Sequence, residues 1–303
     1  MRKNLQKKKI LVIAHDAGGG EIIAAYVKAN LHKNDFYCYA RGPALNVFLR
    51  ERISCKQVLA TRIAIARLIK KHRDVNFVLL GTGWMTKIES FALAEAKLHG
   101  LRCAVYLESW SGFRERFGYP SKNWKENLPD EIWVGDKPAL LLAGKFFKTI
   151  KVRYVPNQYF AYIKKRYRLL RKNKTKPSDI LFLSDAVPGT EKIFEDFLLH
   201  LPPKSKPYDV RVRFHPADDR SRYDEIITRV SGTIVIKKSK EKDLVRDLSL
   251  ANVVVGTETV AMVGAVLAGK KTLSIVLLGN KKATLPFAGI TRVNTGRAAA
   301  RLI

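Results

Sequence analysis

The chain has 303 residues, of which 47 % are hydrophobic, so it is long enough for two domains with substantial cores. Lysine and arginine number 56 against 27 acidic residues, and the formal charge of +29 favours polyanionic partners: nucleic acid, an anionic membrane surface or phosphorylated substrates. A solvated, lysine-rich surface would explain the same charge. Three cysteines without metal-ligand spacing argue against a disulfide framework, and the first apolar run, residues 10–14, is too short for a signal peptide or a membrane span.

The first predicted element is a buried strand at residues 9–14, followed by the sequence HDAGGG and an amphipathic helix at 21–30. A strand, a Gly-rich turn and a helix open many nucleotide-binding α/β domains, although the G-x-G-x-x-G spacing is absent here. The glycines would let a ligand approach the backbone closely. The candidate binding residues in this turn are Gly18, Gly19 and Gly20, and the candidate catalytic residue is Asp16. A plain turn in which Asp16 caps the helix accounts for the same residues.

Further strands are predicted at 36–40, 76–80, 102–107, 131–134 and 152–155, with helices at 44–50, 63–71 and 88–99. This alternation predicts a parallel sheet with helices on both faces. The loops that follow parallel strands share one edge of the sheet, where ligands bind. The candidates in these loops are Thr82, Trp84, Glu108 and Trp110.

A long connection at 111–129 mixes aromatic and basic residues. Long loops in compact domains are often functional, so we interpret it as a lid or an acceptor-binding segment, or as a surface excursion pinned by its aromatic side chains.

Residues 162–177, YIKKRYRLLRKNKTKP, contain eight basic residues, and no acidic residue occurs between Asp136 and Asp179. We place a basic linker at 161–178, between a first domain at 1–160 and a second at 179–303. The segment would suit an anionic membrane surface, where each basic residue contributes about 1 kcal/mol, or it is a solvated linker helix.

The second half repeats the α/β pattern, and one of its strands, at 209–214, ends in Arg213-Phe214-His215-Pro216. Arg213 offers a bidentate contact to a phosphate, and His215 offers a hydrogen bond to a phosphate, a ribose or a base. In isolation, His215 is more simply interpreted as a structural turn histidine, and Pro216 ends the strand.

The stretch 252–276 reads as a strand, a helix from Val260 and a second strand after Gly269. A helix that begins at the carboxyl end of a parallel strand presents free N–H groups and is a natural phosphate site. Thr257 and Thr259 add hydroxyl groups for a phosphate, and Glu258 suits a sugar hydroxyl. A plain N-cap is the alternative interpretation.

Together, RFHP and GTETVAMVGAVLAGKKTLSI resemble the C-terminal domain of GT-B-type glycosyltransferases, with a pattern similar to bacterial sialyltransferases, polysialyltransferases and capsule or teichoic-acid polymerases. The resemblance implies that His215 and Pro216 contact the nucleotide, that Thr257 and Thr259 hold the donor phosphate, and that Asp16 is the general base. It covers the C-terminal half, and the N-terminal half by architecture only. The acidic-acidic-Gly pattern is not reproduced, and Thr-Glu-Thr replaces the usual serines.

We therefore expect two Rossmann-like, parallel-sheet domains that face each other across a cleft, as in GT-B proteins. The predicted function is a metal-independent glycosyltransferase of bacterial surface-polysaccharide synthesis (capsule or lipopolysaccharide). Asp16 or Glu108 would deprotonate a glycan or lipid-linked acceptor, and the helix start with Arg213 and His215 would stabilise the departing phosphate of the nucleotide-sugar donor. We predict no metal and no cofactor, because the sequence has no Asp-x-Asp motif and no His/Cys cluster.

Two alternatives stay open. One is a nucleotide-sugar epimerase or hydrolase on the same fold, for which several carboxylates and histidines around the sugar would be required. The other is a non-enzymatic polyanion-binding protein, although we do not expect nucleic acid as the partner. The expected location is the cytoplasm, or the inner face of the cell membrane if residues 162–177 bind anionic lipid.

Overall fold

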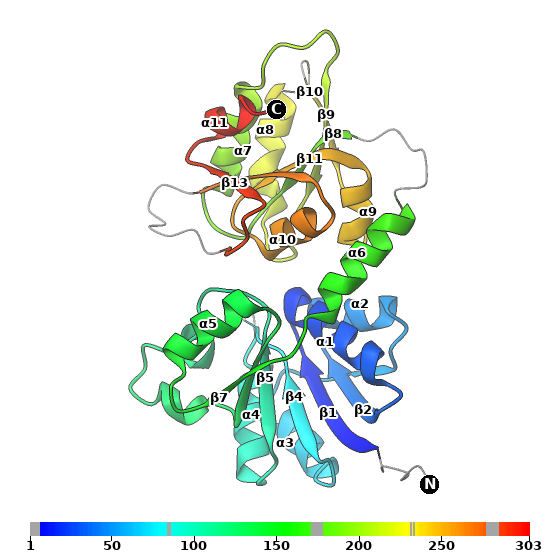
Figure 1. Cartoon of the computed structure of the whole chain (residues 1–303), viewed down its shortest axis with the longest axis vertical. Helices are drawn as coiled ribbons and strands as arrows, with labels where there is room; N and C mark the ends of the chain where they lie inside the picture. Colours follow the sequence, from blue (N-terminus) through cyan, green and yellow to red (C-terminus); the bar gives the residue numbers. More distant parts are fainter. Residues whose placement is uncertain (1–6, 84–85, 171–177, 231, 233, 277–284) are drawn as a thin grey trace. The chain divides into compact units, whose positions relative to one another are not determined.

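The computed structural model describes residues 7–83, 86–170, 178–230, 232, 234–276 and 285–303. The chain divides into two compact units, Met1–Tyr159 (unit 1) and Phe160–Ile303 (unit 2), whose elements are labelled in Figure 1. Each unit contains one sheet in which all neighbouring strands are parallel. The prediction of two Rossmann-like domains is confirmed.

Unit 1 forms a sheet of seven strands within the described residues, in the order β3-β2-β1-β4-β5-β6-β7. The strands are β1 (Lys8–Ala14), β2 (Asn34–Ala40), β3 (Cys55–Gln57), β4 (Phe77–Leu80), β5 (Cys103–Leu107), β6 (Glu131–Val134) and β7 (Lys151–Tyr154). The helices are α1 (Ala17–Asn30), α2 (Gly42–Arg50), α3 (Arg62–Lys71), α4 (Ile88–Leu98), α5 (Lys137–Phe146) and the start of α6 (Gln158–Leu170), with 3₁₀ turns η1 (Glu115–Phe117) and η2 (Trp124–Asn127). Strand β3 and helix α5 were not predicted from the sequence.

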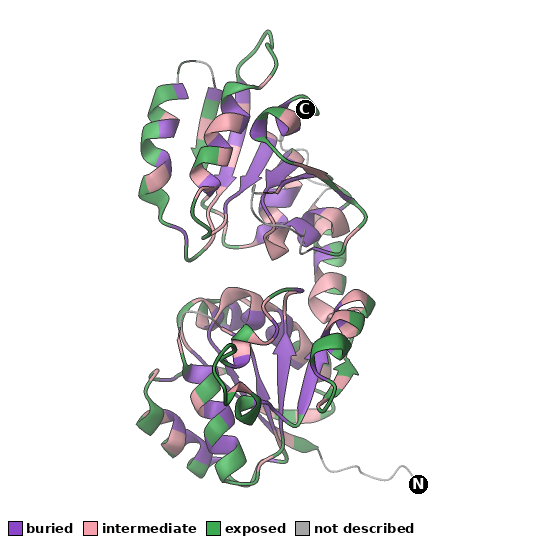
Figure 2. Ribbon diagram, turned by 90° about the vertical axis from the view of Figure 1, so that its left-hand side faces the viewer, coloured by how far each residue is buried: buried purple, intermediate pink, exposed green. Residues whose placement is uncertain are grey.

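The two faces of this sheet are set by the alternation of side chains along each strand. Ile10, Val12 and Ala14 of β1 share a core with α1 and α2. The intervening residues, Leu11 and Ile13, are fully buried on the opposite face. The buried interior of the strands is visible in Figure 2. Both faces of β1 are apolar, as expected for a parallel strand with helices on both sides.

The three glycines after β1 lie in the first turn of α1, and not in a turn before the helix as predicted. The reason is close packing: a β-carbon on Gly20 would lie 2.9 Å from the Cα atom of Ala44 in α2. Glycine therefore lets α1 and α2 approach each other. Each glycine lowers helix stability by about 1 kcal/mol relative to alanine. The three glycines lie in the first turn, where few intrahelical hydrogen bonds depend on these residues.

Unit 2 forms a sheet of six strands within the described residues, in the order β10-β9-β8-β11-β12-β13. The strands are β8 (Ser178–Leu183), β9 (Tyr208–Arg213), β10 (Ile234–Lys238), β11 (Ala251–Gly256), β12 (Lys271–Ile275) and β13 (Ile290–Val293). The helices are α7 (Thr190–Leu199), α8 (Asp224–Val230), α9 (Leu244–Ser249), α10 (Val260–Leu267) and α11 (Gly296–Ala300), with the 3₁₀ turn η3 (Arg220–Tyr223). Helices α7, α8 and α11 share one core with the sheet.

Helix α6 contains part of the segment predicted as a basic linker at 161–178. Ile163 is buried, and its Cδ1 atom would lie 3.5 Å from a β-carbon on Gly264 of α10. Residues 171–177 lie outside the described residues, and β8 begins at Ser178. The proposed limits of the linker stay a prediction. No helix in the described parts of the chain is both long and apolar enough to cross a membrane.

Candidate functional site

The carboxyl ends of β8, β9 and β11 lie side by side in unit 2, because β8 pairs with both neighbours. The connection after β8 leads to β9 on one side, and the connection after β10 crosses back to β11 on the other side of β8. Ligands bind at such a reversal of strand order in open α/β sheets. The residues brought together at this edge are Ser184 and Asp185 after β8, Phe214 and His215 after β9, and Thr257, Glu258 and Thr259 after β11.

Gly256 closes β11 at the tightest point of this edge. A β-carbon there would lie 2.7 Å from the carbonyl oxygen of Leu183 and 3.0 Å from the sulfur of Met262. Only glycine fits between β8 and the first turn of α10. Thr259 is the N-cap of that helix and its side chain makes no capping hydrogen bond. The predicted helix start therefore lies at the carboxyl edge, with backbone N–H groups suited to an anion.

The hydroxyl of Thr257 donates to Asp185 Oδ2 at 3.2 Å, and Thr257 is buried. Glu258 accepts hydrogen bonds from Ser274 Oγ at 2.9 Å and from the backbone N–H of Leu285 at 3.0 Å, and Arg292 lies 3.7 Å from the same carboxylate. These contacts anchor the loop between β11 and α10. Asp185 adds a negative charge, which suits a ribose hydroxyl better than a phosphate.

Arg213 and His215 differ in their surroundings. Arg213 donates to Asp247 Oδ2 at 2.7 Å and to the carbonyl of Glu241 at 2.8 Å, and the Asp247 side chain is fully buried. The guanidinium therefore neutralises a buried carboxylate of α9. His215 is half-buried; its backbone N–H donates to Ser184 Oγ at 2.9 Å, and its Nδ1 accepts from the backbone N–H of Ala217 at 3.2 Å. Pro216 is exposed.

The equivalent edge of unit 1 gathers the ends of β1, β4 and β5, which are adjacent strands. His15 and Asp16 follow β1, Thr82 follows β4, and Glu108 follows β5. His15 is buried, and its Nδ1 shares a 2.8 Å hydrogen bond with Asp16 Oδ1. Asp16 is the N-cap of α1, but its side chain makes no capping hydrogen bond. The capping role considered for Asp16 therefore does not occupy its carboxylate.

Glu108 is held by two partners. Its Oε2 accepts a short hydrogen bond from the Thr82 hydroxyl, and its Oε1 lies 2.7 Å from Arg116 Nη1. Arg116, in η1 of the long 111–129 connection, also donates to Ser109 Oγ at 2.7 Å. The long connection thus supplies a buried guanidinium to the strand-end cluster. Gly18 packs on this pair, since a β-carbon there would lie 3.0 Å from Glu108 Cγ.

Glu89, in the first turn of α4, is a third carboxyl group at this edge. A β-carbon on Gly83 would lie 3.2 Å from Asp16 Cγ and 3.3 Å from Glu89 Oε2, so both carboxyl groups converge on Gly83. Glu89 is 7 % exposed, and neither of its carboxylate oxygens makes a well-formed hydrogen bond within the described residues. A buried acidic group without a partner is costly to ionise.

Burial raises the pKa of Glu89 to about 8, opposed in part by the backbone N–H groups of Glu89 and His15 and increased by the negative charges of Asp16 and Glu108. Glu89 therefore keeps its proton near neutral pH. A protonated carboxyl group beside a second carboxyl group is the arrangement of an acid–base pair. Asp16, Glu89 and Glu108 are called the carboxyl cluster below.

The predicted site residues that remain are Trp110, Gly19 and Trp84. Trp110 is buried and donates through Nε1 to both oxygens of Asp136, at 3.1 and 3.0 Å, which places it on the N-cap of α5. Gly19 packs against the backbone of Thr82. Trp84 lies outside the described residues.

Sequence reasoning missed Glu89. The sequence feature that could have identified Glu89 is its position, as an acidic residue, within the apolar stripe of a helix. The other residues of that stripe in α4 are Ile88, Ala92, Leu93 and Ala96, all of them buried. Arg116 was noted only as one basic residue of a long loop. Within the described residues, no group of three or more His, Cys, Asp or Glu side chains is arranged to hold a metal ion. The absence of a metal stays a prediction.

No protein-family model matches the sequence, and no curated protein is detectably similar to it. Solved structures are similar in fold. A UDP-GlcNAc 2-epimerase from Methanocaldococcus jannaschii, in complex with UDP-GlcNAc and UDP, has a TM-score of 0.69 at 11 % identity, covering 97 % of this chain and 91 % of that one. A putative UDP-N-acetylglucosamine 2-epimerase from Listeria monocytogenes has a TM-score of 0.69 at 12 % identity, covering 98 % and 86 %.

MurG from Acinetobacter baumannii has a TM-score of 0.52 at 12 % identity, covering 97 % of this chain and 89 % of that one. At these identities the similarity establishes the fold alone, and the fold is GT-B-like as predicted. The finer resemblance to sialyltransferases and capsule polymerases finds no support in these structures.

Proposed function

We propose that this protein is an enzyme that acts on a nucleoside-diphosphate sugar and transfers protons at the sugar, as an epimerase does. The observation that carries the proposal is the carboxyl cluster, in which the buried Glu89 side chain makes no well-formed hydrogen bond within the described residues. Burial raises its pKa to about 8. For epimerisation at C2, a base removes the C2 proton while the C1–O bond to the nucleotide breaks, so that a C1=C2 double bond forms and the bonding electrons of C1–O leave with the diphosphate. An acid then protonates C2 from the opposite face as the diphosphate adds back to C1, so the reaction requires two proton-carrying groups. An epimerase was expected to need several carboxylates and histidines around the sugar, and Glu89 lies beside Asp16 at Gly83.

In this proposal Glu89 is the acid, and Asp16, hydrogen-bonded to His15, is the base. Glu108, paired with Arg116, orients a sugar hydroxyl. Within unit 2 considered by itself, the N-terminus of α10 with the Thr259 hydroxyl suits a phosphate, and Asp185 suits a ribose hydroxyl. The similarity in fold to UDP-GlcNAc 2-epimerases supports UDP-GlcNAc as the first substrate to test.

Glycosyl transfer is the second candidate function, and the similarity to the MurG structure favours keeping it. A transferase of this kind needs one general base for the acceptor hydroxyl. Glycosyl transfer gives the buried Glu89 no role in catalysis, and we therefore rank this function second. The bacterial surface-polysaccharide role and the glycan or lipid-linked acceptor belong to this candidate.

The test is incubation of the full chain with UDP-GlcNAc in deuterated buffer without an acceptor, followed by NMR. We expect deuterium at a ring carbon, together with an epimeric nucleotide sugar or with UDP and free sugar. Glu89→Gln and Asp16→Asn should each lower the rate at least about 100-fold, the usual effect of losing a general acid or base. The control is Glu95→Gln, a second buried acid of α4 that pairs with Arg62. No deuterium uptake, but sugar transfer once an acceptor glycan is added, would favour the transferase.

A further inference from the structure

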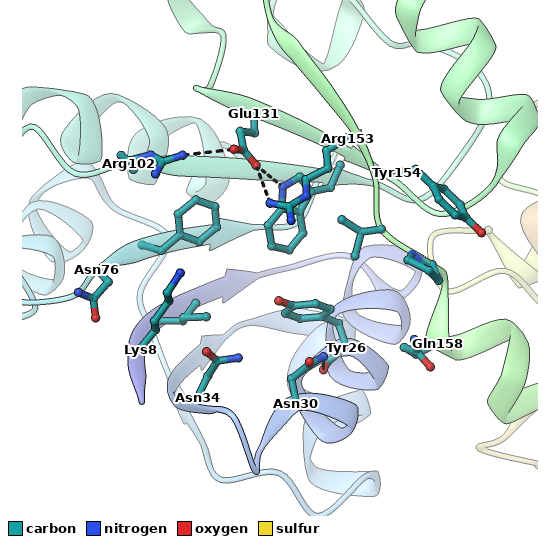
Figure 3. Close-up of a pocket in the computed structure, with 15 residues that line it drawn as sticks. Lys8, Tyr26, Asn30, Asn34, Asn76, Arg102, Glu131, Arg153, Tyr154 and Gln158 are labelled. Atoms are coloured by element: carbon teal, nitrogen blue, oxygen red, sulfur yellow. Dashed lines mark hydrogen bonds and ion pairs between the residues drawn. The ribbon is translucent and has the colours of Figure 1, made fainter. Parts of the chain in front are cut away.

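Unit 1 contains a cavity of about 640 Å³ that belongs to neither strand-end cluster (Figure 3). It is lined by the first residues of β1, β4 and β6, including Lys8, Phe77 and Glu131, and so lies toward the amino ends of these strands. The carboxyl cluster lies at the opposite ends of β1, β4 and β5. The volume is within the range of small-molecule sites, about 300–1,000 Å³.

The topology of the sheet explains why this cavity exists. The connections through α1 and α2 run from β1 toward β3, and right-handed crossovers place both helices on one face. The later connections run back across the sheet and on toward β7, so their helices cover the other face. The amino-terminal half of β4 to β6 is therefore left open beside the last turns of α1, where Tyr26 and Asn30 line the cavity.

Aromatic side chains form one wall of the cavity. The rings of Phe77 and Trp133 are stacked with centroids 5.5 Å apart, and Tyr26 packs edge-on against Trp133 at 5.3 Å. Trp133 is buried, whereas Phe77 and Tyr26 are only partly buried and Tyr154 is 46 % exposed. Apolar rings left open to a cavity suit the face of a planar ligand.

The charges around the cavity are predominantly positive. Glu131 is buried and accepts from Trp133 Nε1 at 2.9 Å and from Arg102 at 3.2 Å, with Arg153 at 3.7 Å. Lys8 is exposed and has no ion-pair partner within the described residues. Figure 3 shows Lys8 with Asn34 and Asn30 on one side, and Arg102, Glu131 and Arg153 on the other. Three cations thus face one carboxylate that is already satisfied.

We propose that this cavity binds a mononucleotide, as a second ligand site separate from the proposed catalytic one. The base would stack on the aromatic wall, where loss of one stack costs about 1–3 kcal/mol in other proteins. The side-chain amide of Asn76 or Asn30 would pair with the base edge, as Asn does with adenine. The phosphates would meet Lys8, Arg102 and Arg153. This proposal does not depend on the proposed function.

The test measures binding of ATP, adenosine and inorganic triphosphate to the full chain by calorimetry. We expect ATP to bind more tightly than either fragment. Lys8→Glu should weaken ATP at least about 10-fold and leave adenosine unchanged. Tyr26→Ala removes one ring of the aromatic wall and should weaken both about 5-fold to 150-fold, the range for one base–aromatic stack. The matched control is Lys56→Glu, which reverses the charge of another exposed strand lysine outside the cavity.

Three results would overturn the proposal: ATP affinity unchanged by Lys8→Glu and Tyr26→Ala, inorganic triphosphate binding as tightly as ATP, or tighter binding of a single-stranded oligonucleotide or an acidic oligosaccharide. Photolabelling with an azido-ATP gives an independent readout, and label on the peptides that carry Tyr26 or Phe77 supports the site. Turnover of UDP-GlcNAc should be unaffected by Lys8→Glu and lost in Glu89→Gln. Failure of either proposal is therefore distinguishable from failure of the other.

Discussion

At the residue scale, Glu89 differs from the other acidic side chains of the carboxyl cluster. Glu108 is held by Thr82 and Arg116, and Asp16 by His15, whereas Glu89 is buried without a well-formed hydrogen bond within the described residues. A structural carboxylate would be paired, because an unpaired buried polar group lowers stability. A buried acid that lowers stability at the carboxyl edge of a sheet is typical of a functional group.

The raised pKa makes a prediction for stability. The folded state holds the Glu89 proton up to a pKa of about 8, and the unfolded state releases it near the ordinary value of 4.5. Between these values the folded state binds more protons, so the free energy of unfolding should fall as pH rises, by about 1.4 kcal/mol per pH unit. Glu89→Gln stays neutral and should lack this fall, becoming more stable than the wild type above pH 8.

Urea unfolding of both proteins at pH 6, 7, 8 and 9 checks this prediction, with Glu95→Gln as the control. Parallel pH profiles for the wild type and Glu89→Gln would show that Glu89 titrates normally in the folded protein.

At the element scale, strand β9 is tied to helix α9 through one buried carboxylate. Asp247 accepts from Arg213 at 2.7 Å and from the Ser239 hydroxyl at 2.7 Å, and Arg211 lies 3.8 Å away. Arg211 and Arg213 are two residues apart, so strand alternation places both on the same face of the sheet. The ion pairs with Asp247 account for both arginines of β9, and no ligand is needed to explain them.

Removal of Asp247 should therefore be severe. Asp247→Ala leaves two arginines without their buried partner, and breaking a buried ion pair typically costs about 3–5 kcal/mol. The matched control is Asp224→Ala, because Asp224 forms an exposed pair with Lys238 at 2.5 Å and should cost at most about 1 kcal/mol. Denaturant midpoints of the two variants measure the difference. Equal losses would mean that Asp247 is not a structural anchor.

At the scale of the whole molecule, the charge of +29 is not explained by the two strand-end sites. Basic side chains are concentrated on α6, where Lys164, Lys165 and Arg168 are exposed, and Arg166 lies 3.6 Å from Asp243. An exposed basic helix face is attracted to anionic lipid, with about 1 kcal/mol for each basic residue near the surface.

We therefore predict that the full chain sediments with vesicles that contain phosphatidylserine, and that salt releases it. Neutralising Lys164, Lys165 and Arg168 to glutamine should weaken this binding on the order of 100-fold. Neutralising Lys56, Lys70 and Lys71, which are exposed on β3 and α3, is the control of equal charge. Equal losses in the two variants would assign the attraction to net charge, and no vesicle binding would make α6 a solvated helix.

Much of the fold was predictable from the sequence, because apolar periodicity is a local property of the chain. The strands at β1, β4, β5 and β11 and the helix start at Val260 follow from β-branched runs and from the glycines after them. The strands β3 and β13 and the helices α5, α8 and α11 were missed. Strand β3 has only three residues, and three residues are too few to show a period.

The sequence alone determined that two parallel α/β domains form and that polar residues follow their strands. Only the tertiary structure decided which of these residues meet, because strand order and helix packing join positions far apart in the chain. It placed Glu89 beside Asp16, joined Arg116 to Glu108, and directed Arg213 to Asp247. The protonation of Glu89 depends on burial by the whole unit, and no local pattern encodes burial of that kind.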